Sequence, residues 1–218
     1  MDVEELYRRY AAGERDFSGV DLSGANFNVA NVTFLEELEP GQNELSSINL
    51  CGANLTRAKM TFVNLSGADL RGTQLFDATL KDVNLNDANL SGANLSLINT
   101  DDSSFKRANL KGAILSEAGM YTVDLEDANL SDANLQCATT RDSSLKRVNL
   151  EGAILWESGM SNCDLEGANL KKVLLDEAGF SDCNLRDAIF DDDNWWRSCY
   201  VKNTIMPGGT ALTNVIED

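Results

Sequence analysis

The sequence predicts an all-β solenoid, a chain wound into four-sided coils of 20 residues that stack along one axis. From residue 48 onward, a large apolar residue, mostly leucine, recurs at every fifth position as far as Ile205. A period of five fits neither an amphipathic helix nor the alternation of an ordinary strand, whereas it fits a chain that turns a corner every five residues. Residues 81–120 and 121–160 are identical at 25 of 40 positions, a longer repeat that corresponds to two such coils.

When the large residues are aligned with a period of 20, they form four columns, one for each face of the coil. The first column starts at Leu50, the second at Leu55, the third at Leu65 and the fourth at Met60. A coil this narrow has room for only four large side chains, so the residue two positions before each of them must be small. We therefore expect the residue at every multiple of five from 50 to 205 to point inward.

Two threonines, Thr100 and Thr140, interrupt the fourth column. We expect each hydroxyl to hydrogen-bond to nearby backbone, because a buried polar group without a partner is costly, while neighbouring side chains fill the remaining space. The alternative interpretation is a local site where the wall of the solenoid dips.

The five-residue units ANLSG, ANLSD and ANLKK resemble the A(D/N)LXX repeat of the pentapeptide-repeat family, and such units cover most of the chain. The resemblance implies a right-handed quadrilateral parallel β-helix. It also implies that the central residue and the small residue two before it point inward, while the other three face solvent. Some members of this family are acidic dimers that mimic DNA and occupy the DNA-binding surface of gyrase, so that function must be weighed here too.

Both open ends of a stacked β-helix need a cover, because an uncovered strand edge promotes aggregation. We assign residues 1–14 as an amino-terminal capping α-helix, whose apolar face would consist of Val3, Leu6, Tyr7 and Tyr10. At the carboxyl end, bulky residues replace leucine and are predicted to seal the last coil, a dimer contact being the alternative. They are Trp195, Trp196 and Tyr200.

The β-helix itself is assigned to residues 15–205, followed by a carboxyl-terminal tail at 206–218. The five-residue register breaks once, between the centres Val32 and Leu45, which are 13 residues apart. We therefore predict an acidic loop at 33–44, interpreted as a tolerated insertion, with a recognition role as the alternative.

Composition limits the classes of partner. The net charge of −17 argues against direct nucleic-acid binding, which depends on clustered lysine and arginine. No apolar run reaches about 18 residues, so no membrane insertion is expected. The amino terminus lacks a signal-peptide pattern, and five cysteines without CxxC pairs suit a reducing compartment. We therefore expect a cytoplasmic protein.

The sequence offers little for catalysis. It contains no histidine, and its acidic residues occupy outward positions with no pocket between them. We predict that the protein is not an enzyme and has no catalytic residues, cofactor or metal site. Cys163 and Cys183 stand one coil apart at the small inward position, close enough in principle for a disulfide, and are interpreted as core filler. The other cysteines are predicted to face outward: Cys51, Cys137 and Cys199.

The second face is the candidate protein-contact face, because it carries an unusual number of outward apolar residues. The candidate residues are Phe76, Ile114, Ile154, Trp156, Leu174 and Trp196, with Leu97 beside them. An acidic rim around them would favour a partner with basic groups. The rim residues are Glu117, Glu157, Asp176 and Glu177.

Two functions remain open at this stage. The first is a non-catalytic protein–protein interaction or scaffold module that binds an unidentified protein partner, as a monomer or a homodimer. The alternative is a DNA mimic that binds or inhibits DNA gyrase. The chain departs from that alternative because no carboxyl-terminal dimerising helix is evident, and because acidic and basic residues alternate from coil to coil on the third face.

Overall fold

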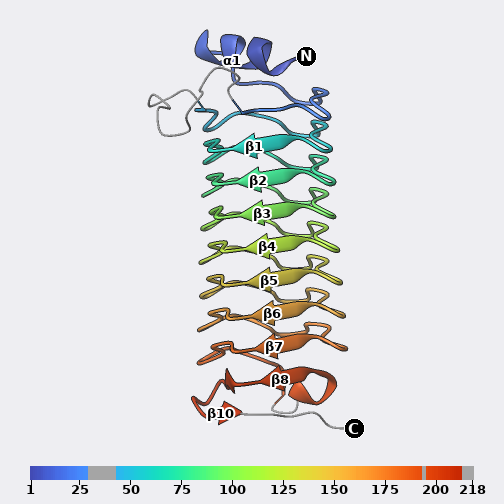
Figure 1. Ribbon diagram of the computed structural model, residues 1–218, viewed down its shortest axis with the longest axis vertical. Helices are drawn as coiled ribbons and strands as arrows, with labels where there is room; N and C mark the ends of the chain where they lie inside the picture. Colours follow the sequence, from blue (N-terminus) through green and yellow to red (C-terminus); the bar gives the residue numbers. More distant parts are fainter. Residues whose placement is uncertain (29–42, 193–194, 213–218) are drawn as a thin grey trace.

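The computed structural model describes residues 1–28, 43–192 and 195–212, which form a straight parallel β-solenoid (Figure 1). Its fourth face is an eight-stranded parallel sheet in chain order, in which each residue of β1 to β6 pairs with the residue 20 positions further on, as Met60 does with Leu80. The strands are β1 (Lys59–Thr61), β2 (Thr79–Lys81), β3 (Asn99–Asp101), β4 (Gly119–Tyr121), β5 (Thr139–Arg141), β6 (Gly159–Ser161), β7 (Gly179–Ser181) and β8 (Tyr200–Lys202).

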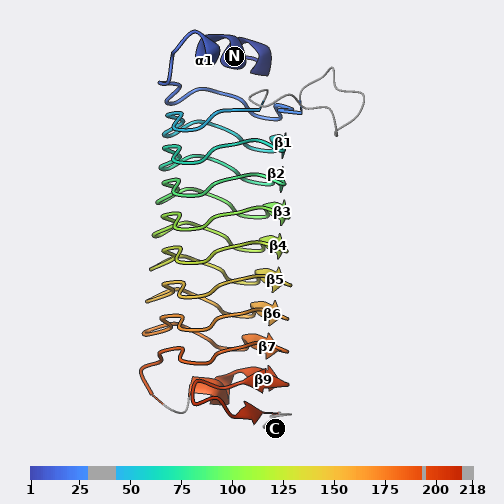
Figure 2. The same ribbon diagram turned by 90° about the vertical axis from the view of Figure 1, so that its left-hand side faces the viewer.

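The other three faces are joined by single parallel bridges rather than strands. Asn89 pairs with Asn109 on the first face, for example, and Ile154 with Leu174 on the second. Figure 2 accordingly shows the arrows along one side of the rod only. Each coil is thus hydrogen-bonded to the coil before it and the coil after it, and its stability depends on these neighbours.

The corners explain why each repeat ends as it does. At the corner after Leu50, the Ala53 amide donates to the Leu50 carbonyl over 2.9 Å, and Gly52 has a φ of 66°. A β-turn with positive φ at its third residue favours glycine, asparagine and aspartate, the residues that often stand two after each centre. Larger residues also occupy this conformation, among them Leu97 with a φ of 58°.

The Asn or Asp before each centre stabilises the same corner. The Asn89 side-chain oxygen accepts a hydrogen bond from the Ser91 amide, and it also accepts one from the Asn109 side chain in the next coil. The oxygen can accept both hydrogen bonds because an amide carbonyl carries two lone pairs. The A(D/N)L pattern therefore reflects a turn requirement as well as a contact between coils.

The core follows the predicted columns from 50 to 185, since every multiple of five in that range is buried. The small residues two positions earlier are buried as well, apart from the half-buried Val173. Cys163 and Cys183 occupy two of these small positions, as predicted, and both are free thiols.

The prediction is wrong in the last coil, where one additional residue shifts the register. Phe180 pairs with Val201 instead of Tyr200, so Tyr200 is 58% exposed and Val201 is buried. The shift occurs at a short 3₁₀ helix, η2 (Trp195–Ser198), which packs more residues into each unit of length than a strand does. A shift of one residue exchanges inward and outward positions.

The same shift explains the burial of other residues at this end. Met206 is buried where Ile205 was expected, and Ile205 is half-buried. Cys199, predicted to face outward, is buried instead. Beyond β8, the short strand β9 (Thr204–Ile205) pairs antiparallel with β10 (Ala211–Leu212), so part of the predicted tail continues the fold.

Aromatic rings close this end. The rings of Phe190 and Trp195 stack with centroids 4.0 Å apart, and Trp195 meets the Phe180 ring edge-on at 5.6 Å. Both Phe190 and Trp195 are half-buried rather than fully inward. The side chain of Trp196 lies outside the described residues.

The first coil is completed by residues from both sides of the register break. Phe17, Leu22 and Phe27 are buried beneath the next coil, and Leu45 fills the third face. Glu44 forms a bridge with Asn64, and Asn43 is buried, so regular structure includes these two residues that were assigned to the predicted loop. Val32 and loop residues 33–42 lie outside the described residues.

The helix α1 (Val3–Ala11) lies across the amino-terminal end of the rod (Figures 1 and 2). Asp2 caps it by accepting a hydrogen bond from the Glu5 amide over 2.8 Å. Its apolar face covers the first coil: Leu6 is fully buried, and the Tyr10 hydroxyl donates to the Ser46 carbonyl over 2.8 Å.

We predict that Leu6→Ala lowers the free energy of unfolding by about 2–5 kcal/mol, because it leaves a cavity between helix and coil. Deletion of residues 1–14 should have a larger effect, exposing the first coil and lowering the midpoint of thermal unfolding or causing aggregation. Urea denaturation and light scattering would measure both. A monodisperse truncated protein of unchanged stability would show that the helix protects nothing.

Thr100 contradicts the expectation about its hydroxyl. Its side chain is buried, and within the described part of the chain its Oγ1 has no hydrogen-bond partner. Thr73, by contrast, is buried with its hydroxyl placed to donate to the carbonyls of Leu70 (2.7 Å) and Leu50 (3.1 Å). Thr73 therefore serves as a control for Thr100, because both are buried but only the Thr73 hydroxyl is hydrogen-bonded.

We predict that Thr100→Val raises the free energy of unfolding by about 1–3 kcal/mol, because it removes an unpartnered buried hydroxyl at nearly constant volume. Thr73→Val, the control, should lower it, since that change removes a hydrogen bond. Urea denaturation measures both changes. Equal effects of the two substitutions would contradict the conclusion that the Thr100 hydroxyl has no hydrogen-bond partner.

Candidate functional site

The second face brings three of the predicted contact residues together as one apolar patch, defined here as Ile154, Trp156 and Leu174. Ile154 and Leu174 are bridge partners in adjacent coils, hence about 4.8 Å apart along the rod. Trp156 follows Ile154 across the inward-pointing Leu155, so both face outward. Trp156 is 39% exposed and Leu174 44% exposed.

The remaining predicted residues are not part of this patch. Ile114 is exposed, but Asn134 stands between it and Ile154 in the column of bridges. Phe76 is half-buried and lies four coils from Trp156, roughly 19 Å along the rod at the usual strand spacing. Exposed Leu97 lies at a corner. Nothing can be said of the Trp196 side chain, which is outside the described residues.

The surroundings of the apolar patch are acidic. The predicted rim residues are all exposed: Glu117, Glu157, Asp176 and Glu177. Toward the carboxyl end, a recess of about 220 Å³ adjoins Leu174 and is lined by Asp176, Asp191, Phe190 and Trp195 among others. An apolar centre with carboxylates around it is complementary to a surface that combines apolar and basic side chains.

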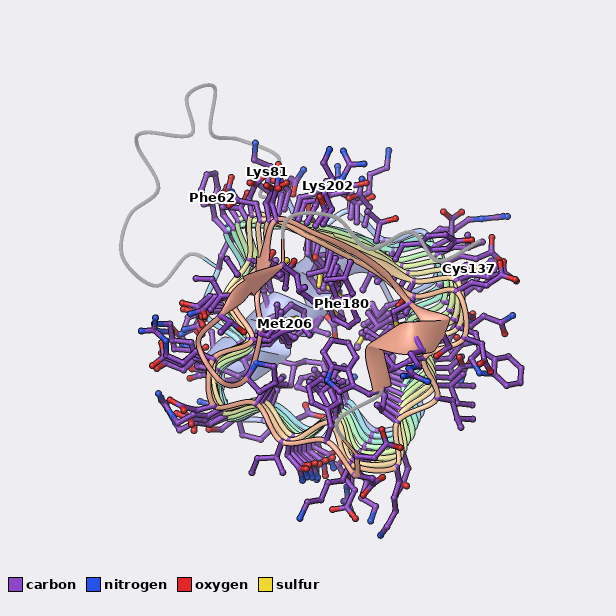
Figure 3. The ribbon with its side chains drawn as sticks, turned by 90° about the horizontal axis from the view of Figure 1, so that it is seen from below. Phe62, Lys81, Cys137, Phe180, Lys202 and Met206 are labelled. Carbon is purple, nitrogen blue, oxygen red and sulfur yellow. The ribbon has the colours of Figure 1, made fainter. Side chains whose placement is uncertain are left out.

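The first and third faces satisfy their own polar groups. On the first face, side-chain amides donate from coil to coil from Asn169 down to Asn89. On the third face, Lys106 pairs with Asp124 (2.8 Å) and Arg147 with Asp127 (2.7 Å). Figure 3, which looks along the rod, shows side-chain nitrogen and oxygen atoms mostly around the outside of the coils. Neither face presents an unbalanced charged surface.

Three of the five cysteines, Cys163, Cys183 and Cys199, are buried and placed for packing. The Cys183 thiol is within hydrogen-bonding distance of the Met160 carbonyl at 3.4 Å, and Cys163 is similarly close to Ser161 at 3.3 Å. A hydrogen bond with Cys183, together with burial, raises the pKa of the Cys163 thiol far above its ordinary value. Burial raises the pKa of Cys199 to about 11. Both thiols therefore stay protonated at neutral pH and are poor nucleophiles.

The described residues contain no group of three potential metal ligands among histidine, cysteine, aspartate and glutamate. Within the same ranges, no helix has the length and hydropathy required to cross a membrane.

One surface feature was missed by the sequence analysis. On the fourth face, Gly159 and Gly179 stand directly before the centres of β6 and β7, and a hollow of about 410 Å³ lies over them. The signal was present as glycine at 119, 159 and 179, in a column where other coils carry lysine, threonine or asparagine. A glycine contributes no side chain to its column, so the pattern of large and charged residues gives no indication of the hollow.

The fold and the surface define a repeat protein of the β-solenoid class. The sequence profile described as pentapeptide repeats matches eight copies, in overlapping segments that together span residues 44–192. The chain therefore belongs to the pentapeptide-repeat family.

One solved structure supports the same fold. A trypsin-treated form of QnrB1, a plasmid-mediated fluoroquinolone resistance protein, matches with a TM-score of 0.72 over 88% of this chain and 89% of that one, at 16% identity. HetL, a pentapeptide repeat protein involved in heterocyst differentiation regulation from the cyanobacterium Nostoc sp. strain PCC 7120, is 26% identical over 97% of this chain and 100% of its own, with a TM-score of 0.31. A search of curated proteins finds no match. The QnrB1 similarity confirms the quadrilateral β-helix and shows the fold alone.

We predict that Trp156→Ala and Leu174→Ser each change the free energy of unfolding by no more than about 0.5 kcal/mol, because both side chains project from the rod. Leu155→Ala changes the fully buried residue directly before Trp156 and should lower the free energy of unfolding by about 2–5 kcal/mol. Urea denaturation of the three variants measures this contrast. A large loss for Trp156→Ala would show that the indole stabilises the fold instead of remaining available for contact.

Proposed function

We propose that the protein is a non-catalytic protein-interaction module of the cytoplasm, and that its apolar patch contacts a protein partner. The observation that carries the proposal is the exposure of Trp156 and Leu174. Trp156 lies on the same coil as Ile154, and Leu174 lies on the next coil as the bridge partner of Ile154. Aromatic anchors beside aliphatic neighbours contribute much of the energy of known interfaces. A repeated, self-supporting rod also holds such residues in fixed positions, which lowers the entropic cost of binding.

The chemistry around the apolar patch supports one kind of partner. Its acidic rim and the recess beside Leu174 favour a surface with an apolar centre and basic groups around it. The location in the cytoplasm is part of the same proposal, and the free state of all five cysteines is compatible with a reducing compartment.

The net charge of −17 is compatible with the DNA-mimic alternative, but the charge pattern of the third face does not favour it. Most carboxylates of the third face are paired with lysine or arginine, so this face does not present a continuous row of unpaired negative charge as DNA does. The similarity to QnrB1 concerns the fold and transfers no activity. A gyrase supercoiling assay with added protein remains the direct test of that alternative.

The proposal predicts that association with a partner, or with a second copy of the chain, weakens at least tenfold in Trp156→Ala and in Leu174→Ser. Ile189→Ser is the control, because Ile189 is equally apolar and 48% exposed but lies on the first face. Sedimentation velocity tests self-association, and titration against partners purified with the wild-type protein tests heterologous binding. If both patch variants bind like the wild type, or if Ile189→Ser is equally impaired, the proposal is wrong.

A further inference from the structure

We propose that the hollow on the fourth face binds an aromatic side chain of a partner protein, at a point where that partner carries acidic residues next to the aromatic one. The hollow extends over the four strands β5 to β8 and has a volume of about 410 Å³, within the range of pockets that hold small ligands. This inference does not rest on the apolar patch, which lies on a different face.

The floor of the hollow is bare backbone. A Cβ atom added to Gly159 would meet nothing within 4 Å, and one added to Gly179 would only approach the Ser158 carbonyl at 3.8 Å. The large residues of the same strands, Met160 and Phe180, are buried, and Figure 3 shows Phe180 inside the rod. Long side chains stand at the two ends: Arg141 at the β5 end, with Tyr200 and Lys202 at the β8 end.

The protein itself shows what fills such a space. Gly119 occupies the same column on β4, and there the ring of Tyr121 folds back over it, with Cε2 3.0 Å and the hydroxyl 3.5 Å from the position of an added Cβ. An aromatic ring that packs on a strand glycine shields the exposed backbone and stabilises the sheet. On β6 and β7 the corresponding residues are Ser161 and Ser181, which are too small to do this. The two glycines are therefore without the aromatic cover that Gly119 has.

The charged residues around the hollow determine which residues should flank the aromatic residue of the partner. Arg141 and Lys202 both line it, although the chain as a whole carries a net charge of −17. Within the described ranges neither forms an ion pair. The nearest corner carboxylates, Asp142 and Asp182, instead accept hydrogen bonds from side-chain amides in the following coil. Two cations at opposite ends of an apolar floor are complementary to acidic residues on both sides of an aromatic one.

The substitutions Gly159→Thr and Gly179→Thr test the site without disturbing the fold. Neither glycine has a left-handed φ, and the same column already carries threonine at Thr79 and Thr139. The double variant should therefore fold normally while its side chains occupy the hollow. Asn99→Thr is the matched control, because it makes the same residue in the same column outside the hollow.

The probe is a blocked pentapeptide with one tryptophan between two pairs of glutamates, titrated calorimetrically into the full-length protein at low ionic strength. We expect saturable binding that falls at least tenfold in the glycine double variant and is unchanged in Asn99→Thr. Arg141→Gln and Lys202→Gln should each weaken binding by up to about fivefold, the range of an exposed ion pair. A peptide with leucine in place of tryptophan, or with lysine in place of glutamate, should bind at least tenfold more weakly.

Three results would overturn the proposal. They are absence of binding at millimolar peptide, equal affinity of the wild type and the glycine double variant, and equal affinity for the tryptophan and leucine peptides. Circular dichroism of each variant confirms that the fold is intact. The outcome is independent of the apolar patch, because Trp156→Ala should leave binding of this peptide unchanged.

Discussion

Each turn of this rod encloses so little space that every five residues can place only one large and one small side chain inside. Backbone hydrogen bonds between successive coils, such as that from the Leu70 amide to the Asn89 carbonyl at 2.7 Å, hold the coils in register around this core. The spacing of leucine, the alanine two residues earlier and the turn residue two residues later all follow from that restriction. So does the burial of the inward side chain at every multiple of five from 50 to 185.

The same geometry determines what the surface can do. Residues 20 positions apart lie side by side on the same face in adjacent coils. Like residues at such positions therefore form ladders, and residues of opposite charge form pairs. The amide ladder near Asn129 and the ion pairs near Arg147 are of this kind, and both stabilise the rod internally. Surface available for contact arises where the ladder is interrupted, by apolar residues near Trp156 or by glycines near Gly159.

The repeat made the core predictable, because inward positions depend only on counting in fives, and from Leu50 to Leu185 that count holds. It failed at Tyr200 since the 3₁₀ helix that inserts one residue has no signature in a sequence scanned for large residues.

The patch around Leu174 was predicted because outward apolar residues are visible in the columns. The hollow over Gly179 was not, because an absent side chain attracts attention only when neighbouring coils are compared. The hydroxyl of Thr100 was misjudged, since hydrogen-bond geometry cannot be inferred from column position.

The reversal of the chain after β8 also changes the carboxyl-terminal edge of the rod. A parallel solenoid could in principle add further coils, because each coil ends in free backbone donors and acceptors that match the next. After Tyr200, however, the chain turns back, and β10 pairs antiparallel with β9, so groups that would receive another parallel coil are used within the chain. Together with α1 across the other end, this reversal reduces the backbone edge exposed for parallel pairing with a second copy.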